Sequence, residues 1–332
     1  MKIAFFSAKP YDREFFNLHN KSYGFELEYF ETHLGPHIVN AVESAEAVCV
    51  FVNDKLNEET IRVLASKKIK IIALRCAGFN NVDLEAARKF GIKVCRVPAY
   101  SPEAVAEHAV AMILTLNRKT HKAYNRVREQ NFSLNGLLGF NLNGKTIGVI
   151  GTGKIGTAFC RIMLGFGVRI LASDIIENEE LKKSGVSYTS VDKLLELSDI
   201  ISLHCPLTAQ SHYLINKETV AKMKQGMMLI NTSRGGLINT QDIIVALKKG
   251  QVGYLGIDVY EQEEKLFFRD LSGKIIEDDE IQRLMSFPNV LITAHQAFFT
   301  REALTQIAQI TLDNIAQLSA GKIPNDELVM LT

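Results

Sequence analysis

Residues 145–163 read KTIGVIGTGKIGTAFCRIM and contain the pattern Gly-x-Gly-x-x-Gly at Gly151, Gly153 and Gly156. An apolar run that suits a β-strand leads into these glycines, and a helical pattern follows them. A dinucleotide turn needs this context, because its glycines permit a tight bend, close approach of the backbone to a pyrophosphate, and close packing of helix on strand. We therefore expect a dinucleotide site here, with Lys154 and Ile155 inside the turn as further contacts.

Asp174 ends the next strand-like run, VRILASD, a little over 20 residues after the glycines. A carboxylate at this point can accept hydrogen bonds from the ribose hydroxyls of the adenosine half of the cofactor. Ile175 and Ile176 follow it, where an arginine would be needed to bind a 2′-phosphate. The sequence therefore favours NAD over NADP.

The turn begins almost 150 residues into the chain, and a separate α/β pattern precedes it. Five short strand-like runs alternate with helical ones in this first part: KIAFFS, ELEYF, AVCVFV, IKIIALRC and IKVCRVP. Such alternation predicts a parallel sheet covered by helices on both faces. The stretch SPEAVAEHAVAMILTLNRKTHKAYNRVREQ at residues 101–130 then predicts one long helix that leads into a second part.

Six further strand candidates follow: TIGVIG, VRILASD, DIISLHC, MMLINTS, GYLGIDV and NVLITA. Their number matches a doubly wound dinucleotide sheet. The last amphipathic stretch, TREALTQIAQITLDNIAQLSAGK, has no strand after it, so we expect it to return to the first part. The predicted α/β architecture has two Rossmann-like domains, a flavodoxin-like substrate domain at 1–100 plus 299–332 and an inserted NAD-binding domain at 101–298. The cleft between two such domains is the expected ligand site.

The composition describes an ordinary globular enzyme. The chain has 332 residues, and its formal net charge of +1 leaves no basic surplus to bind nucleic acid. The five cysteines lie mostly in apolar runs without metal-ligand spacing, which predicts buried free thiols, no metal site and a reducing compartment. No apolar run is long enough for a membrane helix or a signal peptide, so we expect a cytoplasmic protein without a membrane partner.

Polar residues recur where the strands of the second series end, and the carboxyl edge of such a sheet is where ligands bind. The residues at these ends are His204, Cys205, Pro206, Thr232, Ser233, Arg234, Asp258 and His295. The segment at residues 261–288 is charged and long for a connection, so it is either a functional loop or a solvated excursion.

Three of these side chains could carry an acid-base reaction on a carboxylic acid. Arg234 can bind a carboxylate through two parallel hydrogen bonds, and a surface ion pair is its alternative role. His295 can donate a proton near neutral pH, although a histidine after a strand is often only a capping residue. Glu263 could hold that imidazole in its protonated form, but within the run YEQEEK the acids Glu261 and Glu264 are equally eligible.

The motifs VIGTGKIG, LHCPLT, INTSRGGLINT, GIDVYEQE and AHQAFFT, in this order after a first domain without the glycine pattern, resemble those of the D-isomer-specific 2-hydroxyacid dehydrogenases. The resemblance covers essentially the whole chain. ALRCAGFNNVD, RVPAYSPEAVAEHAV and HQAFFT are similar to the lactate branch of that family in particular. Ala294 departs from the pattern, because many relatives have proline before the catalytic histidine.

The resemblance implies roles for individual residues. It makes Arg234 the group that binds the substrate carboxylate, Glu263 the acid that orients the imidazole, and His295 the acid-base catalyst. It places Asp258 beside the nicotinamide carboxamide. It assigns substrate contacts to Ala77, Gly78, Tyr100 and Phe298.

The activity implied by the resemblance is NADH-dependent reduction of pyruvate to D-lactate by a homodimer or homotetramer. One alternative is the same chemistry on a larger 2-keto acid such as phenylpyruvate or 2-ketoisocaproate. Phe298 and Phe299 beside His295 favour a small pocket, but one methylene group discriminates by only ~1–3 kcal/mol. A more remote alternative is a non-catalytic regulator that senses NAD(H).

Overall fold

The chain forms two compact units in the computed structural model, which describes residues 1–324 and 329–332. Unit 1 consists of Met1–Ser101 and Phe299–Thr332, and unit 2 of Pro102–Phe298. The expected C-terminal part of the first domain includes residues 325–328, which lie outside the described residues.

Unit 1 is built on a five-stranded parallel sheet with the order β2-β1-β3-β4-β5. This order is that of flavodoxin-like folds. The strands are β1 (Lys2–Phe5), β2 (Glu26–Tyr29), β3 (Ala47–Val50), β4 (Ile71–Leu74) and β5 (Lys93–Arg96). All five coincide with the runs expected from the sequence.

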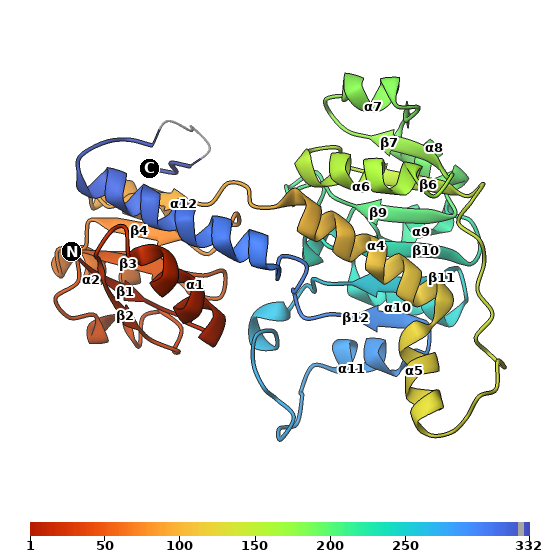
Figure 1. The fold of residues 1–332 in the computed structure, drawn as a ribbon, viewed down its shortest axis with the longest axis horizontal. Coiled ribbons are helices and arrows are strands. Elements are labelled where there is room, and N and C mark those ends of the chain that lie inside the picture. Colours follow the sequence, from red (N-terminus) through yellow and green to blue (C-terminus); the bar gives the residue numbers. More distant parts are fainter. Residues whose placement is uncertain (325–328) are drawn as a thin grey trace. The chain divides into compact units, whose positions relative to one another are not determined.

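Helices cover both faces of this sheet. Side chains of α2 and α3 join those of alternate strand positions in one apolar core. Helix α12 packs on α1, β4 and β5, and Figure 1 shows it running beside β4. The expected return of the last amphipathic stretch to the first sheet is confirmed. The helical elements are α1 (Pro10–Asn20), η1 (Val39–Ala41), α2 (Glu58–Ser66), α3 (Leu84–Lys89) and α12 (Arg301–Ser319).

A buried ion pair links Arg75, the residue after β4 of unit 1, to Asp12 of α1. The Arg75 guanidinium lies 3.2 Å from the Asp12 carboxylate, and their side chains are 1% and 6% exposed. Arg75 also donates hydrogen bonds to the carbonyl oxygens of Phe6 and Ser7, and it lies over the ring of Phe5. These donors and acceptors offset the cost of removing two charges from water.

Unit 2 contains a seven-stranded parallel sheet with the order β12-β11-β10-β9-β6-β7-β8. Six of its strands match the expected runs, but the seventh, β8, was not expected. It has only two residues, too few to produce an alternating pattern. The strands are β6 (Thr146–Ile150), β7 (Arg169–Ser173), β8 (Ser187–Tyr188), β9 (Ile200–Leu203), β10 (Met227–Asn231), β11 (Val252–Ile257) and β12 (Val290–Ile292).

Two apolar cores lie on opposite faces of this sheet. Helices α4, α6 and α7 contribute to one core, and α8, α9, α10 and α11 to the other. The helical elements are α4 (Pro102–Arg118), α5 (Thr120–Arg128), α6 (Lys154–Leu164), α7 (Glu179–Lys183), α8 (Val191–Leu197), α9 (Lys217–Ala221), η2 (Gly235–Leu237), α10 (Thr240–Lys248), η3 (Glu263–Lys265) and α11 (Asp279–Ser286).

The single long helix expected over residues 101–130 is wrong, because the structure divides it into α4 and α5. Lys119 between them has a left-handed backbone with φ of +49°, which no regular helix can contain. Just before the break, the Asn117 side chain exchanges two 2.8 Å hydrogen bonds with the backbone of Phe140. The chain beyond α5 therefore folds back onto the end of α4.

No helix within residues 1–324 and 329–332 combines the length and the apolar character needed to cross a membrane. In the same residues, no three His, Cys, Asp or Glu side chains are grouped so that they could hold a metal ion.

Replacing Asp12 with alanine leaves the Arg75 charge buried without its partner. We expect the free energy of unfolding of unit 1 to fall by about 3–5 kcal/mol. The measurement is chemical denaturation followed by circular dichroism. Asp192→Ala is the control, since Asp192 pairs with Lys222 at an exposed site and its loss should change little. Equal effects of the two substitutions would contradict the prediction.

Candidate functional site

The glycine turn after β6 has the geometry expected of a dinucleotide turn. Gly151 has φ of +94°, and an added Cβ would lie 2.5 Å from the backbone nitrogen of Cys205. A Cβ on Gly156 would lie 2.0 Å from the carbonyl oxygen of Gly151. Both positions therefore exclude every side chain, because the helix and the neighbouring strand approach too closely.

Gly153 differs from the other two glycines, because a Cβ there would meet no protein atom within 4 Å. Its φ of −62° is also open to other residues. Packing within the chain does not require glycine at this position, whereas a pyrophosphate close to the start of α6 would require it. Lys154 and Ile155, the next two residues, begin α6 and are exposed and half-buried, respectively.

Asp174 follows β7 and its side chain reaches back to the glycine turn. One carboxylate oxygen accepts hydrogen bonds from the backbone and the hydroxyl of Thr152, and the other accepts one from the backbone of Ile175. The residue remains exposed, so ribose hydroxyls can reach it. Ile175 and Ile176 are 100% and 80% exposed and offer no positive charge for a 2′-phosphate.

The ends of β9 and β10 are tied together beside the turn. The Ser233 hydroxyl donates a 2.7 Å hydrogen bond to the carbonyl oxygen of Cys205, and Pro206 follows as an exposed residue. Burial raises the pKa of the Cys205 thiol to about 11, so it remains protonated at neutral pH. The buried Thr232 hydroxyl has no hydrogen-bond partner among the described residues, and a bound cofactor would supply one.

Arg234 lies in a turn that Asn231, the last residue of β10, holds in place. Asn231 is fully buried; its amide donates to the carbonyl oxygen of Arg234 at 2.8 Å and accepts from the Ser233 backbone at 3.0 Å. A Cβ on Gly235 would lie 2.1 Å from the Tyr260 backbone, so the segment that follows β11 is close behind the turn. The half-buried guanidinium donates to the Ser233 carbonyl oxygen at 2.7 Å and keeps other donors for a carboxylate.

Glu263 and His295 form a hydrogen-bonded pair. The imidazole Nδ1 is 2.9 Å from Oε1 of Glu263, and both side chains are 19% exposed. Because an ionised carboxylate can only accept, Nδ1 carries a hydrogen and Nε2 is left to donate or accept the reacting proton. The second oxygen of Glu263 accepts a 3.0 Å bond from the Tyr260 backbone, which fixes the orientation of the acid.

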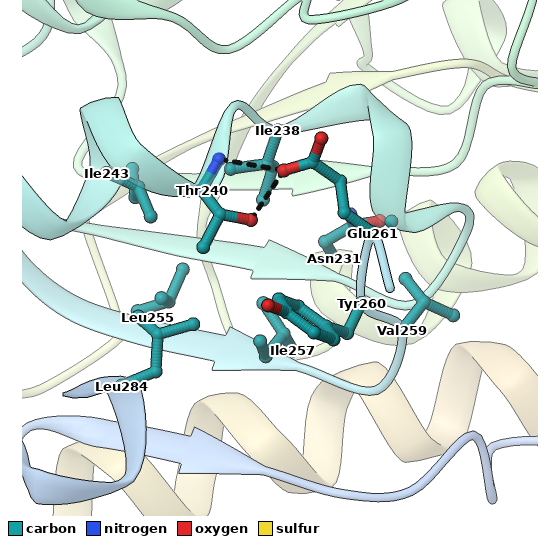
Figure 2. A pocket seen from close by; sticks show the side chains of 11 residues that line it. Asn231, Ile238, Thr240, Ile243, Leu255, Ile257, Val259, Tyr260, Glu261 and Leu284 are labelled. Carbon is teal, nitrogen blue, oxygen red and sulfur yellow. Dashed lines mark hydrogen bonds between the residues drawn. The ribbon is translucent and has the colours of Figure 1, made fainter. Parts of the chain in front are cut away.

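The three acids of the YEQEEK segment are thereby distinguished. Glu261 accepts hydrogen bonds from the backbone and the hydroxyl of Thr240, as Figure 2 shows, and from the Tyr213 hydroxyl. These bonds join the segment to the start of α10, so Glu261 has a structural role. Glu264 is exposed, and of the three only Glu263 contacts the imidazole within the described residues.

Asp258 holds the turn that carries His295. Its carboxylate, 0% exposed, accepts from the Thr293 hydroxyl at 2.6 Å and from the backbone of Gln296 and Ala297 at 2.8 and 2.9 Å. Its carbonyl oxygen accepts from the backbone of His295 at 2.7 Å. His295 has φ of +54°, a conformation that costs non-glycine residues energy and needs such support.

The segment at residues 261–288 is packed against unit 2 along part of its length. Phe267 is 6% exposed, and the ring of Phe268 lies 5.8 Å from that of His295. The Tyr260 hydroxyl donates to Asp278 at 2.9 Å, which joins the start of the segment to the start of α11. This packing favours a functional loop over a solvated excursion.

Phe298 is 6% exposed, and its ring lies 6.5 Å from the ring of His295. Phe299 begins the second segment of unit 1, where its half-exposed ring packs edge-on against Tyr11 at 4.8 Å. The two phenylalanines, which the sequence suggested would fill one pocket, therefore have different surroundings.

The remaining expected substrate contacts belong to unit 1. Ala77 and Gly78 follow β4, and Tyr100 follows β5, so all three lie at the carboxyl edge of the first sheet. The Ala77 carbonyl oxygen accepts a 2.9 Å bond from Arg96, and the Gly78 carbonyl oxygen accepts one from the Cys76 thiol.

Sequence reasoning missed three residues that organise the site. The sequence patterns place Asn231 in a strand, Thr293 in the run NVLITA and His108 in a helix, and they give none of the three a role in a site. Only the polar character of Asn231 and Thr293 at strand ends could have indicated them. His108 lies 185 residues before its partner Thr293, and no local pattern connects them.

Comparisons with known proteins agree on one family. Residues 110–297 match the family model described as D-isomer specific 2-hydroxyacid dehydrogenase, NAD binding domain. D-lactate dehydrogenase of Escherichia coli is 52% identical over 329 residues, which cover 99% of this chain and 100% of that protein. A 2-hydroxyacid dehydrogenase homolog of Haemophilus influenzae is 54% identical over 323 residues, which cover 97% and 98%.

Solved structures of that family are also similar to this chain. The apo-structure of the Escherichia coli D-lactate dehydrogenase has a TM-score of 0.91 at 50% identity and covers 99% of this chain and 100% of its own. The structure of Aquifex aeolicus D-lactate dehydrogenase complexed with NAD and lactic acid has a TM-score of 0.87 at 37% identity, with coverage of 99% and 98%.

Two glycines of the turn should respond differently to alanine. In Gly153→Ala the added methyl group meets no protein atom, so thermal stability should be retained while NADH binding weakens at least about tenfold by loss of close approach. In Gly156→Ala the clash with Gly151 should lower the melting temperature as well. Fluorescence titration and thermal unfolding measure the two effects. Normal NADH affinity in Gly153→Ala would contradict our interpretation of the turn.

Proposed function

Because the chain belongs to the D-isomer specific 2-hydroxyacid dehydrogenase family, we propose that it reduces pyruvate to D-lactate with NADH. The family makes it an NAD-dependent oxidoreductase, and the choice of pyruvate as the keto acid is our proposal. The single observation that supports it best is the 2.9 Å hydrogen bond between Glu263 and His295. These two residues follow β11 and β12, and Arg234 follows β10, the next strand of the sheet.

His295 acts as the proton donor in this proposal. Glu263 holds Nδ1 and stabilises the protonated ring, so the Nε2 proton can pass to the keto oxygen as negative charge develops on it. The left-handed turn fixed by Asp258 keeps the ring in one orientation. Lactate oxidation requires the same imidazole in its neutral form.

Arg234 binds and orients the substrate. Its guanidinium can form two parallel hydrogen bonds to the pyruvate carboxylate, which holds the keto group near the imidazole. We assign further substrate contacts to Ala77, Gly78 and Tyr100. The buried ring of Phe298 beside His295 is assigned to the apolar wall around the methyl group.

The cofactor site is assigned to the glycine turn and the strand ends. Gly151, Gly153 and Gly156 admit the pyrophosphate, and Asp174 accepts from the ribose hydroxyls. NADH, when bound, supplies the hydride for the reduction. Further contacts are assigned to Lys154, Ile155, Cys205, Pro206, Thr232, Ser233 and Asp258.

The first test is NADH oxidation with pyruvate, phenylpyruvate and 2-ketoisocaproate in parallel, followed by chiral analysis of the product. We expect pyruvate to have the highest kcat/KM and to yield D-lactate. Preference for a larger acid would retain the three catalytic roles and overturn the assignment of Phe298. Binding of NADH without turnover of any 2-keto acid would favour a sensor over an enzyme.

His295→Gln removes the proton donor and leaves the cofactor site unchanged. We expect kcat for pyruvate reduction to fall by about 10²–10⁴-fold, the usual contribution of general acid-base catalysis. Stopped-flow and steady-state kinetics measure the fall, and NADH titration provides the control. Near-normal turnover would exclude His295 as the donor.

Two neighbouring acids form a matched pair for testing the orientation of the imidazole. Glu263→Gln should lower kcat at least about tenfold, because the neutral amide no longer stabilises the charged ring. Glu261→Gln should leave kcat within about threefold and instead lower the melting temperature, because Thr240 and Tyr213 lose a charged acceptor. The reverse pattern would transfer the catalytic role to Glu261.

We also propose that the enzyme is a cytoplasmic homodimer or homotetramer. Buried free thiols at four of its five cysteines support a reducing compartment. Large apolar side chains on α5 and on the segment after it are exposed to solvent. An exposed group of apolar side chains in unit 2 supports an interface between two copies of the chain at this place. These side chains are Tyr124, Val127, Phe132, Leu134 and Leu138, each more than half exposed.

Leu134→Glu should disrupt that interface, because it adds a charge to an apolar contact. Sedimentation analysis is expected to show a dimer or tetramer for the wild type and a smaller species for the variant. Ile275→Glu is the control, at a 93% exposed position outside this segment. An unchanged mass of Leu134→Glu would locate the interface elsewhere.

A further inference from the structure

His108 of α4 contacts the turn that carries His295. Its Nε2 lies 3.1 Å from the Thr293 hydroxyl oxygen and 3.5 Å from the Asp258 carboxylate, and its side chain is 16% exposed. Neither the family motifs quoted above nor the proposed mechanism gives this histidine a role. Its ring nevertheless joins α4 to Thr293 and Asp258, two residues that belong to the turn or support it.

The direction of each hydrogen bond in this cluster follows from its members. The Asp258 carboxylate can only accept, so the Thr293 hydroxyl donates its single hydrogen there, at 2.6 Å. The Thr293 oxygen must then accept from His108, which requires a hydrogen on Nε2. His108 is therefore a donor in a chain of bonds that ends on the buried carboxylate.

The same carboxylate supports the turn. Its two oxygens accept from the backbone of Gln296 and Ala297, the residues that follow His295. Burial alone would raise the pKa of Asp258, but the nearby His108 ring and the bonds from Thr293 and Ala297 outweigh it and lower the pKa below its ordinary value. The donors thus keep Asp258 ionised, the form that accepts bonds most strongly.

We propose that His108 is a positioning residue, which acts through Thr293 and Asp258 to hold the turn of His295 in its reactive orientation. The inference rests on the proposed function, because it assigns His295 the acid-base step. His108 itself touches neither reacting atom and exchanges no proton with substrate. Its effect should appear in the rate of the chemical step, since it governs how often the imidazole is correctly placed.

Two substitutions separate the hydrogen bond from the bulk of the ring. His108→Leu removes the donor, whereas His108→Gln keeps an N–H group at nearly the same distance from the backbone. We expect His108→Leu to lower kcat for pyruvate reduction about tenfold with KM changed less than about threefold, the size expected for one bond in a buried charged cluster. His108→Gln should retain kcat within about threefold of the wild type.

Two further variants complete the kinetic test. Glu107→Gln, at the exposed neighbouring position on α4, should behave as the wild type. In a Thr293→Val background, His108→Leu should have a smaller additional effect than in the wild type, because the bond through Thr293 is already lost and only the 3.5 Å contact of His108 with Asp258 remains. Wild-type kcat in His108→Leu, equal losses in His108→Leu and His108→Gln, or full additivity with Thr293→Val would each overturn the proposal.

Hydrogen exchange provides a measurement that does not depend on turnover. The amides of Gln296 and Ala297 should exchange about tenfold faster in His108→Leu than in the wild type, while those of β6 remain unchanged. Unchanged exchange at the turn would overturn the proposal, as would equal acceleration in β6, which indicates general destabilisation. Failure of the wild type to reduce any 2-keto acid would instead reject the proposed function, and the exchange experiment would still decide whether His108 holds the turn.

Discussion

The buried carboxylate of Asp258 is the constraint on which the site in unit 2 depends. Its transfer from water costs several kcal/mol unless bonds replace the lost hydration. The replacement hydrogen bonds come from the backbone and side chains of the turn after β12. The same bonds that stabilise the buried charge therefore also fix the conformation of the turn. A left-handed residue costs about 1–3 kcal/mol, and His295 keeps this conformation because its neighbours leave the backbone no alternative.

Local patterns accounted for most of the fold. The strands of both sheets and the glycine turn follow from alternation and from spacing, which depend on residues near in sequence. The incorrect or missing predictions concern a helix break that involves residues distant in sequence and a strand too short to show a pattern. The helix break at Lys119 accompanies the pairing of Asn117 with Phe140, 23 residues away, and β8 is too short to have a period.

The site was harder to predict than the fold for the same reason. The sequence could not show which of Glu261, Glu263 and Glu264 pairs with the imidazole, because their roles depend on which side of a short turn each side chain faces. Glu263 faces the imidazole, whereas Glu261 faces α10. His108 had no signal at all, since a helix pattern does not reveal which polar residue will meet a strand end far along the chain. Catalytic residues can be found from sequence motifs, whereas the residues that position them are brought together only by the tertiary structure.

The division of unit 1 between both ends of the chain has a consequence for biosynthesis. A ribosome releases β1 to β5 first, but α12, which packs on β4 and β5, emerges only at the end. Unit 2 is continuous in sequence and is completely synthesised before α12 appears. The first sheet therefore lacks the helix that packs on β4 and β5 until unit 2 has been synthesised, so unit 1 can complete its fold only after the whole of unit 2 has left the ribosome.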